Sequence, residues 1–449
     1  MSFPRYENYK DSGVEWLGEV PEHWDVRAIK HIVSIPITDG PHETPNFPDE
    51  GIPFVSAEAV STGVIDFSKI RGFISESDHF RYSQKYLPQF GDIYMVKSGA
   101  TTGITAIVEV DREFNIWSPL AAIRCGKRAI PRFILNFMRS KNFQEAVTLN
   151  WSFGTQQNIG MGVIENLAVT LPPIPEQQTI AAFLDCETAK IDALITEQQR
   201  LIELLKEKRQ SVISHAVTKG LNPNAPMKDS GVEWLGDVPE HWELKATKRL
   251  FRLVVEPAPD DNDHELLSIY TAIGVRPRKE LEEKGNKATT TNGYWMVKKG
   301  DLIVNKLLAW MGAIGISNYD GVTSPAYDIL RQRLPLEPRY YDFLFRCGVC
   351  FSEFRRYSRG IMDMRLRLYF DELGQLYMPY PSKVEQNEIV SFLESELDKF
   401  DPLIAETQLA ISLLQERRTA LISATVTGKI DVRGLVAAKT EVKAGSVPC

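Results

Sequence analysis

Two kinds of hydrophobic pattern alternate along the chain. In residues 24–171, apolar side chains come in short runs such as Ile93–Val96, and Gly, Pro, Asn and Asp separate the runs. Runs of this length between turn-forming residues predict strands. Residues 178–218 contain no Gly or Pro, and their apolar side chains recur at alternating steps of four and three. A repeat of about 3.5 residues sustained over this length predicts a coiled-coil helix.

The same helical pattern returns near the C-terminus, in residues 385–427. About 40 residues at 1.5 Å each would make a rod of roughly 60 Å, and Pro402 is expected to bend the second rod or to delay its first turns. Arg209 interrupts the first apolar seam and Arg418 the second, and each either fixes the register of the pair or lies on a solvated face. The predicted seam consists of Ile191, Ile195, Ile202, Leu205 and Val212 in the first helix and of Phe400, Ile404, Ile411, Leu414 and Leu421 in the second.

A fifteen-residue motif occurs twice. KDSGVEWLGEVPEHW spans Lys10–Trp24, and KDSGVEWLGDVPEHW spans Lys228–Trp242. The repetition marks either a duplicated domain or a docking peptide used twice. Two further matches decide between these, because GDIYMVKSGATTGITAIV from Gly91 matches GDLIVNKLLAWMGAIGIS from Gly300, and the two helical stretches match each other. Repetition over nearly the whole chain indicates a tandem duplication.

The order of these parts predicts an α+β fold of two tandem globular domains joined by two long antiparallel coiled-coil helices. The first helix leads from one globule to the other, so a second helix that pairs with it must run back. The globules are then expected at opposite ends, related by a pseudo-two-fold axis. Shorter helices are predicted to begin at Pro131 and Pro338, because the first turn tolerates Pro. The predicted boundaries are 1–171 for the first globule, 172–222 for the first helix, 223–380 for the second globule, 381–431 for the second helix and 432–449 for a disordered tail.

Composition limits the surroundings and partners of the protein. Of 449 residues, 43% are hydrophobic and 25% are charged, which is typical of soluble proteins with two or more domains at this length. No apolar leader opens the chain and no membrane-length apolar run occurs, so neither a signal peptide nor a membrane span is expected. Five scattered Cys favour a reducing cytoplasm. The net charge of −7 argues against a generally basic nucleic-acid coat but permits a local basic face.

The chain carries no strong catalytic or metal motif. The Asn/Asp-Pro-Pro-Tyr/Phe motif of adenine methylases and the GxxxxGK[ST] phosphate loop are both missing. A nuclease site built from Asp260, Glu282 and Lys284 would lack the expected flanking strands. The pair Cys347 and Cys350 lies in an apolar helical stretch, which favours packing over metal or redox chemistry. We therefore expect a chain that is not an enzyme and that holds no metal or cofactor.

Four features in register resemble the specificity subunits of type I restriction–modification systems. They are the motif SGVEWLGEVPEHW, the Gly-Asp strand with a downstream Gly, the stretch LPPIPEQ at 171–177 and the paired long helices. The segment DGPHETP at 39–45 is also similar to that family, and the resemblance covers residues 10–430. It implies that each globule is a target-recognition domain that reads half of a bipartite, asymmetric site in double-stranded DNA.

The same resemblance implies the partners. The helices would space the two domains and bind two modification subunits, which methylate adenine with S-adenosylmethionine. Restriction subunits would add an ATP- and Mg-dependent translocase and nuclease. These cofactors are therefore expected in the partner subunits and not in this chain.

The loops that follow the two Gly-Asp strands are the first candidates for contact with DNA. Lys97 and Lys306 keep their place in both halves, which suits a sequence-independent phosphate contact. Two domains that recognise different DNA sequences need the same backbone frame with different side chains, as in these loops. The alternative is that each loop only covers the hydrophobic core of its own domain. The side chains that differ are Ser98, Thr101 and Thr102 in the first loop and Leu307, Trp310 and Met311 in the second.

Two further segments contain side chains that can read bases. Gln and Asn pair bidentately with adenine, and Arg pairs with guanine. A solvated surface role is the equal alternative for each of these residues, and His42 and Thr44 are weaker candidates from the segment 39–45. The base-reading candidates are Gln156, Gln157 and Asn158 in the first half and Arg359, Arg365 and Arg367 in the second.

The tryptophans of the repeated motif are identical in both halves, so we interpret them as packing residues. Trp16, Trp24, Trp234 and Trp242 are then predicted to help seat each globule on the helical spacer. The main alternative function for the whole chain is a two-domain adaptor, whose globules bind protein ligands across a rigid spacer.

Overall fold

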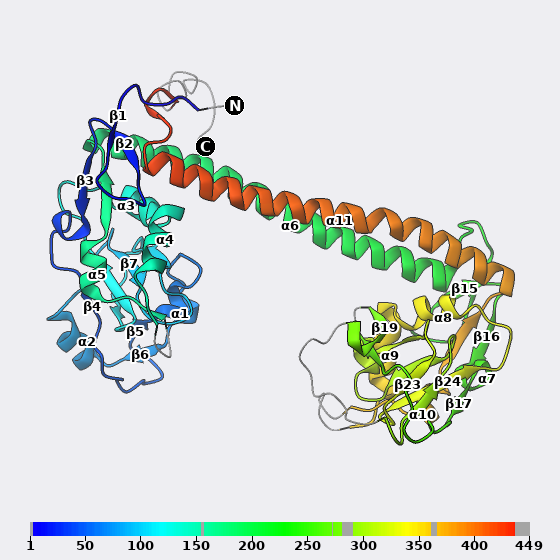
Figure 1. Cartoon of the computed structure of the whole chain (residues 1–449). Coiled ribbons are helices and arrows are strands. Elements are labelled where there is room, and N and C mark those ends of the chain that lie inside the picture. Colours follow the sequence, from blue (N-terminus) through cyan, green and yellow to red (C-terminus); the bar gives the residue numbers. More distant parts are fainter. Residues whose placement is uncertain (1–2, 154–156, 272, 281–290, 361–365, 436–449) are drawn as a thin grey trace. The chain divides into compact units, whose positions relative to one another are not determined.

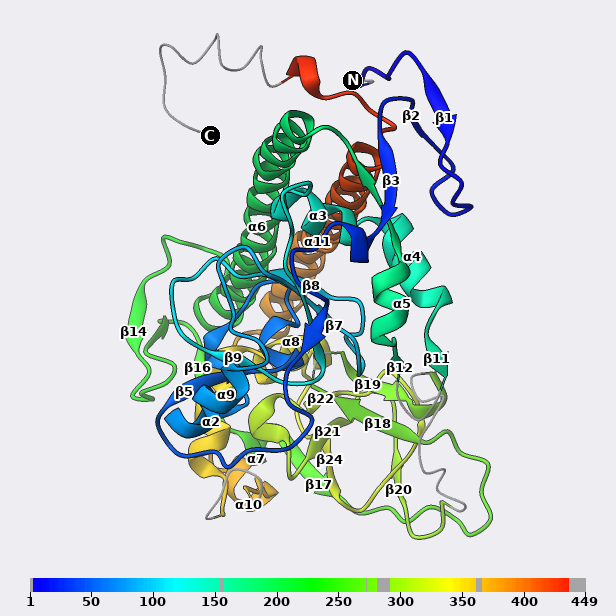
Figure 2. The same cartoon turned by 90° about the vertical axis from the view of Figure 1, so that its left-hand side faces the viewer.

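The computed structural model describes residues 3–153, 157–271, 273–280, 291–360 and 366–435, and Figures 1 and 2 show it in two views. It divides into two compact units. The first unit combines residues up to Gln198 with residues from Leu409 onward, and the second unit runs from Gln199 to Gln408. Each unit therefore holds one globule, part of one long helix and part of the other.

The first unit contains, in chain order, β1 (Tyr9–Asp11), β2 (Glu19–Pro21), β3 (Asp25–Ala28), η1 (Ile29–His31), β4 (Thr38–Asp39), β5 (Ile52–Val55), α1 (Ala57–Val60), η2 (Phe67–Lys69), β6 (Gly72–Ile74), α2 (Glu76–Ser83), β7 (Ile93–Val96), β8 (Thr105–Ile107), β9 (Asn115–Ile116), β10 (Leu120–Ile123), α3 (Pro131–Met138), α4 (Lys141–Leu149), β11 (Ser152–Phe153), β12 (Gln157–Asn158), α5 (Met161–Asn166), β13 (Ala168–Leu171) and the first part of α6 (Ile174–Lys219).

The second unit continues from α6 with β14 (Met227–Asp229), β15 (Asp237–Pro239), β16 (Glu243–Ala246), α7 (Thr247–Leu250), β17 (Phe251–Val254), β18 (Leu267–Tyr270), β19 (Gly274–Pro277), η3 (Arg278–Glu280), β20 (Trp295–Val297), β21 (Leu302–Asn305), η4 (Ala309–Met311), β22 (Ile314–Ile316), β23 (Gly321–Thr323), β24 (Tyr327–Gln332), α8 (Pro338–Phe345), α9 (Gly348–Tyr357), α10 (Phe370–Leu373), β25 (Tyr377–Tyr380) and the first part of α11 (Lys383–Val426).

A four-stranded antiparallel sheet lies at the centre of each unit, and the two sheets match. Their strand orders are β4-β10-β7-β8 and β17-β24-β21-β22. The strand that follows Gly-Asp is β7 in one sheet and β21 in the other, and all four of its residues are buried in both. The strand predicted at Ile93–Val96 is confirmed, as are the helices predicted to begin at Pro131 and Pro338.

The Gly-Asp pair closes a buried ion pair between neighbouring strands. Asp92 accepts hydrogen bonds from Nε and Nη2 of Arg124, both at 2.7 Å. In the second unit Asp301 accepts from the same two atoms of Arg331, both at 2.8 Å. A bidentate guanidinium–carboxylate pair is strong and directional, so this pair fixes how the central strand lies against its neighbour. That requirement explains why both halves keep the motif.

The two long helices pair antiparallel within each unit. Ile191 near the start of α6 and Leu421 near the end of α11 belong to one buried cluster. Ile213 near the end of α6 and Leu397 near the start of α11 belong to another. Each residue of the predicted seam is buried or half-buried, which confirms the predicted fold class. No helix in the described part of the chain has the length and apolar character needed to cross a membrane.

One ion pair in each unit links the paired helices. Arg418 donates from Nε and Nη2 to Asp192 at 2.8 and 3.1 Å in the first unit. At the matched positions of the second unit, Arg209 Nε lies 3.8 Å from Asp401 Oδ1. The structure therefore favours a role for the two seam arginines in register over a purely solvated face.

Pro402 does not delay the second helix, and this part of the prediction was wrong. Helix α11 begins at Lys383, well before Pro402, and continues through it to Val426. A proline removes one backbone hydrogen bond, whereas the apolar seam continues on both sides of it. Packing along the seam thus outweighs the local penalty.

The repeated motif holds the start of α6 in the first unit. Trp24 is fully buried, and its Nε1 donates to Oε1 of Glu176 at 3.1 Å. His23 Nε2 lies 2.8 Å from the other oxygen of the same carboxylate. Glu176 is in the first turn of α6, so the motif ties the globule to the helix that leaves it.

The second copy repeats these contacts at the start of α11. Trp242 Nε1 donates to Glu385 Oε1 at 2.9 Å, and His241 Nε2 lies 2.9 Å from Oε2. The first copy also packs against the end of the other helix, because a Cβ added at Gly428 would lie 2.2 Å from Cδ of Pro21. The packing role predicted for these tryptophans is confirmed for Trp24 and Trp242.

Both described ends of the chain pack on the first unit. The Tyr6 hydroxyl donates to Glu176 Oε1 at 2.7 Å. Burial of this tyrosine, together with the nearby carboxylate, raises the pKa of Tyr6 well above its usual range. Val432 is buried and Leu435 packs beside the same core, so residues 432–435 of the predicted tail lie on the globule. Residues 436–449 lie outside the described residues.

We expect Glu176→Gln to lower the free energy of unfolding by roughly 1–3 kcal/mol. In the wild type, side chains of Tyr6, His23 and Trp24 all contact the Glu176 carboxylate. The amide of a glutamine has one acceptor oxygen in place of two, and its NH2 group is itself a donor. Part of these hydrogen bonds would therefore be lost. Glu385→Gln should lower the free energy of unfolding by less, because the Glu385 carboxylate has two hydrogen-bond partners and is 22% exposed, against 6% for Glu176. Urea denaturation followed by tryptophan fluorescence compares the two variants. A loss for Glu385→Gln as large as that for Glu176→Gln would contradict this account.

Candidate functional site

In both units the loop after the central strand is joined to the second candidate segment. Ile159 N donates to Lys97 O at 2.9 Å in the first unit, and Leu368 N donates to Lys306 O at 2.9 Å in the second. The partners are 62 residues apart in each half (159 − 97 and 368 − 306). Two segments that the sequence suggested separately therefore form one surface in each unit.

The loop of the first unit offers small polar side chains on a fixed backbone. Thr102 is buried, and its hydroxyl donates to the carbonyl of Gly99 at 2.7 Å, so this side chain stabilises the loop backbone. Ser98 and Thr101 are half-buried. The loop closes at Gly103, whose φ of +95° disfavours other residue types.

The hairpin β11–β12 carries the exposed amides of the first unit. Gln157 and Asn158 are both exposed, and Gln157 O accepts from the backbone N–H of Gly99 at 3.0 Å. Their backbones are tied to the neighbouring loop while their side chains face solvent, which is the arrangement that base reading needs. Gln156 lies outside the described residues.

The loop of the second unit is apolar where the first is polar. Leu307 and Met311 are 39% and 49% exposed. Trp310 is half-buried, with its Nε1 donating to Leu307 O at 3.1 Å and the guanidinium of Arg355 5.2 Å from its ring centroid. This indole is therefore held against α9, whereas Leu307, Leu308 and Met311 are exposed on the loop.

Two arginines of the second unit lie on a short hairpin beside that loop. Arg359 and Arg367 exchange backbone hydrogen bonds, both at 2.9 Å. The Arg359 side chain is 75% exposed and forms an ion pair with Glu372, and Arg367 is exposed. Arg365 lies outside the described residues.

Asp39 lies among several charged side chains beside the first loop, and no individual role was predicted for it. Its carboxylate lies 2.8 Å from Lys97 Nζ, 2.6 Å from Lys85 Nζ and 3.0 Å from His42 Nε2. Burial alone would raise the pKa of Asp39, but the two ammonium groups hold it below its usual value. Asp39 begins the segment DGPHETP, and that was the only signal in the sequence. Of the two weaker candidates there, His42 is 71% exposed and Thr44 is also exposed.

The matched lysine of the second unit is compensated by a different carboxylate. Lys306 Nζ lies 3.3 Å from Asp328 and donates to Pro325 O at 2.9 Å. Burial raises the pKa of Asp328, although Lys306 partly opposes the effect. The side chains of Lys97 and Lys306 are only 13% and 22% exposed. Their phosphate contact stays a prediction, and it would require each ammonium to turn away from its carboxylate.

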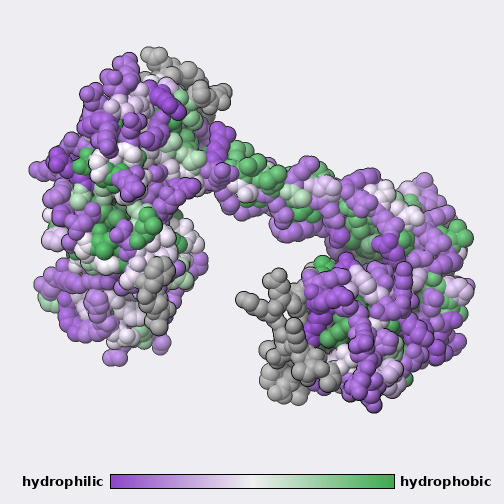
Figure 3. All heavy atoms as spheres, in the orientation of Figure 1, coloured by the Kyte–Doolittle hydropathy of each residue, from purple (hydrophilic) through white to green (hydrophobic). Residues whose placement is uncertain are grey.

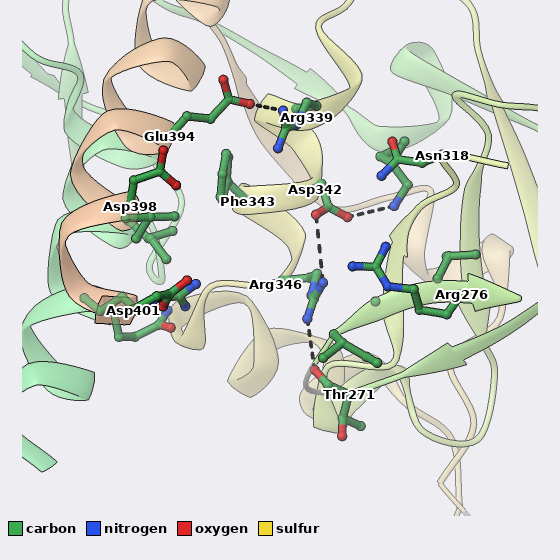
Figure 4. A pocket seen from close by; sticks show the side chains of 18 of the residues that line it. Thr271, Arg276, Asn318, Arg339, Asp342, Phe343, Arg346, Glu394, Asp398 and Asp401 are labelled. Atoms are coloured by element: carbon green, nitrogen blue, oxygen red, sulfur yellow. Dashed lines mark hydrogen bonds and ion pairs between the residues drawn. The ribbon is translucent and has the colours of Figure 1, made fainter. Parts of the chain in front are cut away.

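A cavity of about 680 Å³ lies in the second unit between the globule and the helix segments that it packs against (Figure 4). Four arginines and four carboxylates line it. Arg346 donates to Thr271 O at 3.2 Å and lies 3.9 Å from Asp342, and Arg339 pairs with Glu394 (Figure 4). Because these charges offset one another, the cavity offers no net charge to an ionic ligand.

The two cysteines of the CxxC stretch are packed in the core of the second unit. Cys347 and Cys350 are buried, with their Sγ atoms 3.8 Å apart. They belong to the same apolar cluster as the central sheet, in agreement with the packing role predicted for them. Within the described ranges, no group of three or more His, Cys, Asp or Glu is placed to hold a metal.

Comparison with known proteins agrees with this geometry. The family profile of the type I restriction modification DNA specificity domain matches residues 21–205. This part of the chain is therefore similar to that domain family. Those residues include most of the first globule, with its loop, its hairpin and the segment around Asp39.

Curated proteins that are similar to this chain are specificity subunits of type I restriction enzymes. The chain is 27% identical over 273 residues to the MjaX type I restriction enzyme specificity subunit of Methanocaldococcus jannaschii, which is 59% of this chain and 61% of that protein. It is 22% identical over 310 residues to the EcoBI specificity subunit of Escherichia coli, which is 64% of each. The chain thus matches about three fifths of the length of these relatives.

A solved structure shares the fold. A chain from work on complex assembly and conformational transition of the type I R-M system superposes with a TM-score of 0.64. The match covers 91% of this chain and 98% of that chain at 14% identity. At this identity the match supports the arrangement of elements and not the roles of individual side chains.

We expect Asp39→Asn to destabilise the first unit at neutral pH, because Lys97 and Lys85 would lose the carboxylate that compensates them. The pKa of Asp39 is lower in the folded protein than its ordinary value of about 3.8. The ionised carboxylate therefore adds to the free energy of unfolding at every pH above 3.8. This stabilisation is lost as the pH falls through the lower pKa of the folded state. The difference from wild type should therefore shrink below about pH 4 in urea denaturation. Asp25→Asn is the control, because its carboxylate is 47% exposed and pairs with exposed arginines, where little effect is expected. A difference that persists unchanged at pH 3 would contradict this account.

Proposed function

We propose that this chain is the DNA sequence-recognition subunit of a type I restriction–modification complex. Each unit would read one half of a bipartite, asymmetric target, and the paired helices would space the readers. The proposal rests on the backbone frame that the two units share. In each unit one backbone hydrogen bond joins the loop to the second candidate segment, from Ile159 to Lys97 and from Leu368 to Lys306. On that frame the exposed side chains differ between the units.

The chemistry of the exposed side chains supports reading of different sequences. The first unit exposes Gln157 and Asn158, which can pair with adenine. The second exposes Arg367, which can pair with guanine, beside Leu307 and Met311, which can contact a thymine methyl group. A frame kept by duplication with divergent reading groups is expected when two half-sites differ.

The outer faces of the helices support docking of partner subunits. In the first unit Leu194, Leu409 and Leu413 are 51%, 60% and 55% exposed. In the second unit the matching faces expose Leu204 and Leu403 at 51% and 47%. Figure 3 shows hydrophobic residues on the surface of the helices. Two modification subunits would cover these faces, and restriction subunits would join the assembly.

The catalytic chemistry would then belong to the partners. S-adenosylmethionine, ATP and Mg would bind to the modification and restriction subunits, while this chain supplies sequence selection. The acidic balance of the chain, with a net charge of −7, suggests that it binds DNA weakly alone and tightly in the complex. The alternative, a two-domain adaptor for protein ligands, would show no sequence-selective DNA binding at all.

Selection from randomised duplex DNA tests the proposal directly. The full chain with its modification subunits should enrich one bipartite motif, and binding should weaken steeply with salt, because phosphate contacts release counterions. Failure to enrich any motif would favour the adaptor.

Exchange of one globule tests independent reading. Replacing residues 25–170 with the equivalent domain of a relative should change one half of the enriched motif and leave the other half intact. The reason is that the side chains proposed to contact bases in each unit all belong to the loop and hairpin of that unit. A change in both halves would show that the two units do not read independently.

Substitution of the exposed leucines tests partner docking. Leu409→Gln with Leu413→Gln should weaken binding of the modification subunits at least tenfold, since burial of a leucine is worth roughly 1.5–3 kcal/mol. Folding should be unaffected, because both side chains are more than half exposed. Leu149→Gln is the control, since Leu149 is 78% exposed at the end of α4. Sedimentation of the mixed proteins measures the difference, and equal binding by the double variant would exclude this face.

A further inference from the structure

Helix α2 presents an outward face of exposed side chains. Ser77, Phe80, Arg81 and the C-cap residue Gln84 occupy positions i, i+3, i+4 and i+7, so they lie on one side of the helix. All four are exposed, and Phe80 is 70% exposed. The face thus combines an apolar ring with hydroxyl, guanidinium and amide groups.

The opposite face anchors α2 firmly to the globule. Tyr82 is buried, and its ring centroid lies 6.1 Å from that of Phe54. His79 Nδ1 lies 2.6 Å from Asn115 Oδ1, and the Ser75 hydroxyl caps the first turn. The outward side chains are therefore held in a fixed direction, as base reading requires.

The helix lies beside the candidate loop of the first unit. Lys85, which follows the C-cap residue of α2, pairs with Asp39, and the same carboxylate lies beside Lys97 and His42. Lys97 follows β7 at the end of the sheet where the loop begins. Arg81 of α2 also pairs with Glu43, so these ion pairs place α2 beside the segment 39–45 and, through Asp39, near the start of the loop.

We propose that α2 reads bases in the first half of the DNA target, with Phe80 and Gln84 facing the major groove. This inference rests on the proposed function. The major groove of B-DNA admits one α-helix. Gln84 can pair bidentately with adenine, and the ring of Phe80 can contact the methyl group of thymine.

The charges on the helix agree with a reading role. Arg81 is paired with Asp78 at 2.8 Å and with Glu43 at 2.5 Å, so its charge is compensated within the unit. The helix therefore gains little from general attraction to phosphates, and its contribution to binding should depend on the bases it meets. Arg81 can reach guanine only by leaving these carboxylates.

Selection from randomised duplex DNA by the full chain with its modification subunits tests the inference. The variant Phe80→Ala with Gln84→Ala should relax one half of the enriched motif at one or more positions, with preference falling about 5- to 150-fold for a bidentate contact. The other half should be unchanged. Gln84→Glu keeps the size of the side chain and should shift the preference at one position from adenine to cytosine.

A matched control lies at the other end of the same central strand. Gln89→Ala with Phe90→Ala also removes one exposed amide and one exposed ring, and Phe90 is 74% exposed. These residues precede β7, whereas the loop follows it. The control should keep the wild-type motif, and both double variants should unfold at the wild-type midpoint because only exposed side chains change.

The outcomes separate this inference from the function on which it rests. A wild-type motif that the Phe80 and Gln84 variants leave intact would overturn the role of α2 and leave the proposed function standing. A uniform loss on all sequences would also overturn it, because α2 would then hold DNA without reading it. If the wild-type complex enriches no motif, the proposed function fails and the inference fails with it.

Discussion

The pairing of α6 with α11 is the constraint on which both units depend. Neither globule can be completed by a helix from its own half alone, because the first unit joins residues up to Gln198 with residues from Leu409 onward. Leu421 of the returning helix is buried in the same core as Trp24 and Ile191. Contacts between segments this far apart form slowly, since the loop between them must close first. The Trp–Glu contact at the start of each helix then sets where the globule is attached.

The two units share the contacts that hold the central sheet together, whereas the exposed side chains of their loops differ. The pair Asp92–Arg124 returns as Asp301–Arg331 with the same two hydrogen bonds. Such a pair is costly to break, because loss of one partner leaves a buried charge uncompensated. The exposed side chains of the loops have no such constraint and are free to diverge. The proposed reading of two different sequences would need this division between a shared frame and a variable surface.

Sequence matching alone did not reveal the carboxylates that surround the two matched lysines. Lys97 and Lys306 occupy equivalent places, which suggested a shared role toward phosphate. The fold gives each a carboxylate from a different strand, Asp39 from β4 and Asp328 from β24. A matched position therefore fixes where the backbone of a residue lies, but it does not show whether its charge is available.

The sequence by itself determined the elements whose signal is local and periodic. The seam that includes Ile191 and Leu421, the strand Ile93–Val96 and the helices that begin with Pro131 and Pro338 all follow from spacing within a few turns or residues. Only the tertiary structure decided which surfaces those elements share. The bond from Ile159 to Lys97 joins segments 62 residues apart.

The outward direction of Phe80 also could not be predicted from the sequence. Helix α2 has eight residues, too few for a strong periodic signal, and the direction of its faces depends on Tyr82 packing against Phe54. Asp39 likewise acquires its role from Lys85 and Lys97, which lie on other elements. Periodicity is encoded in neighbouring residues, whereas the partner of a side chain depends on where distant segments come to rest. That placement is a property of the folded chain and not of any stretch of its sequence.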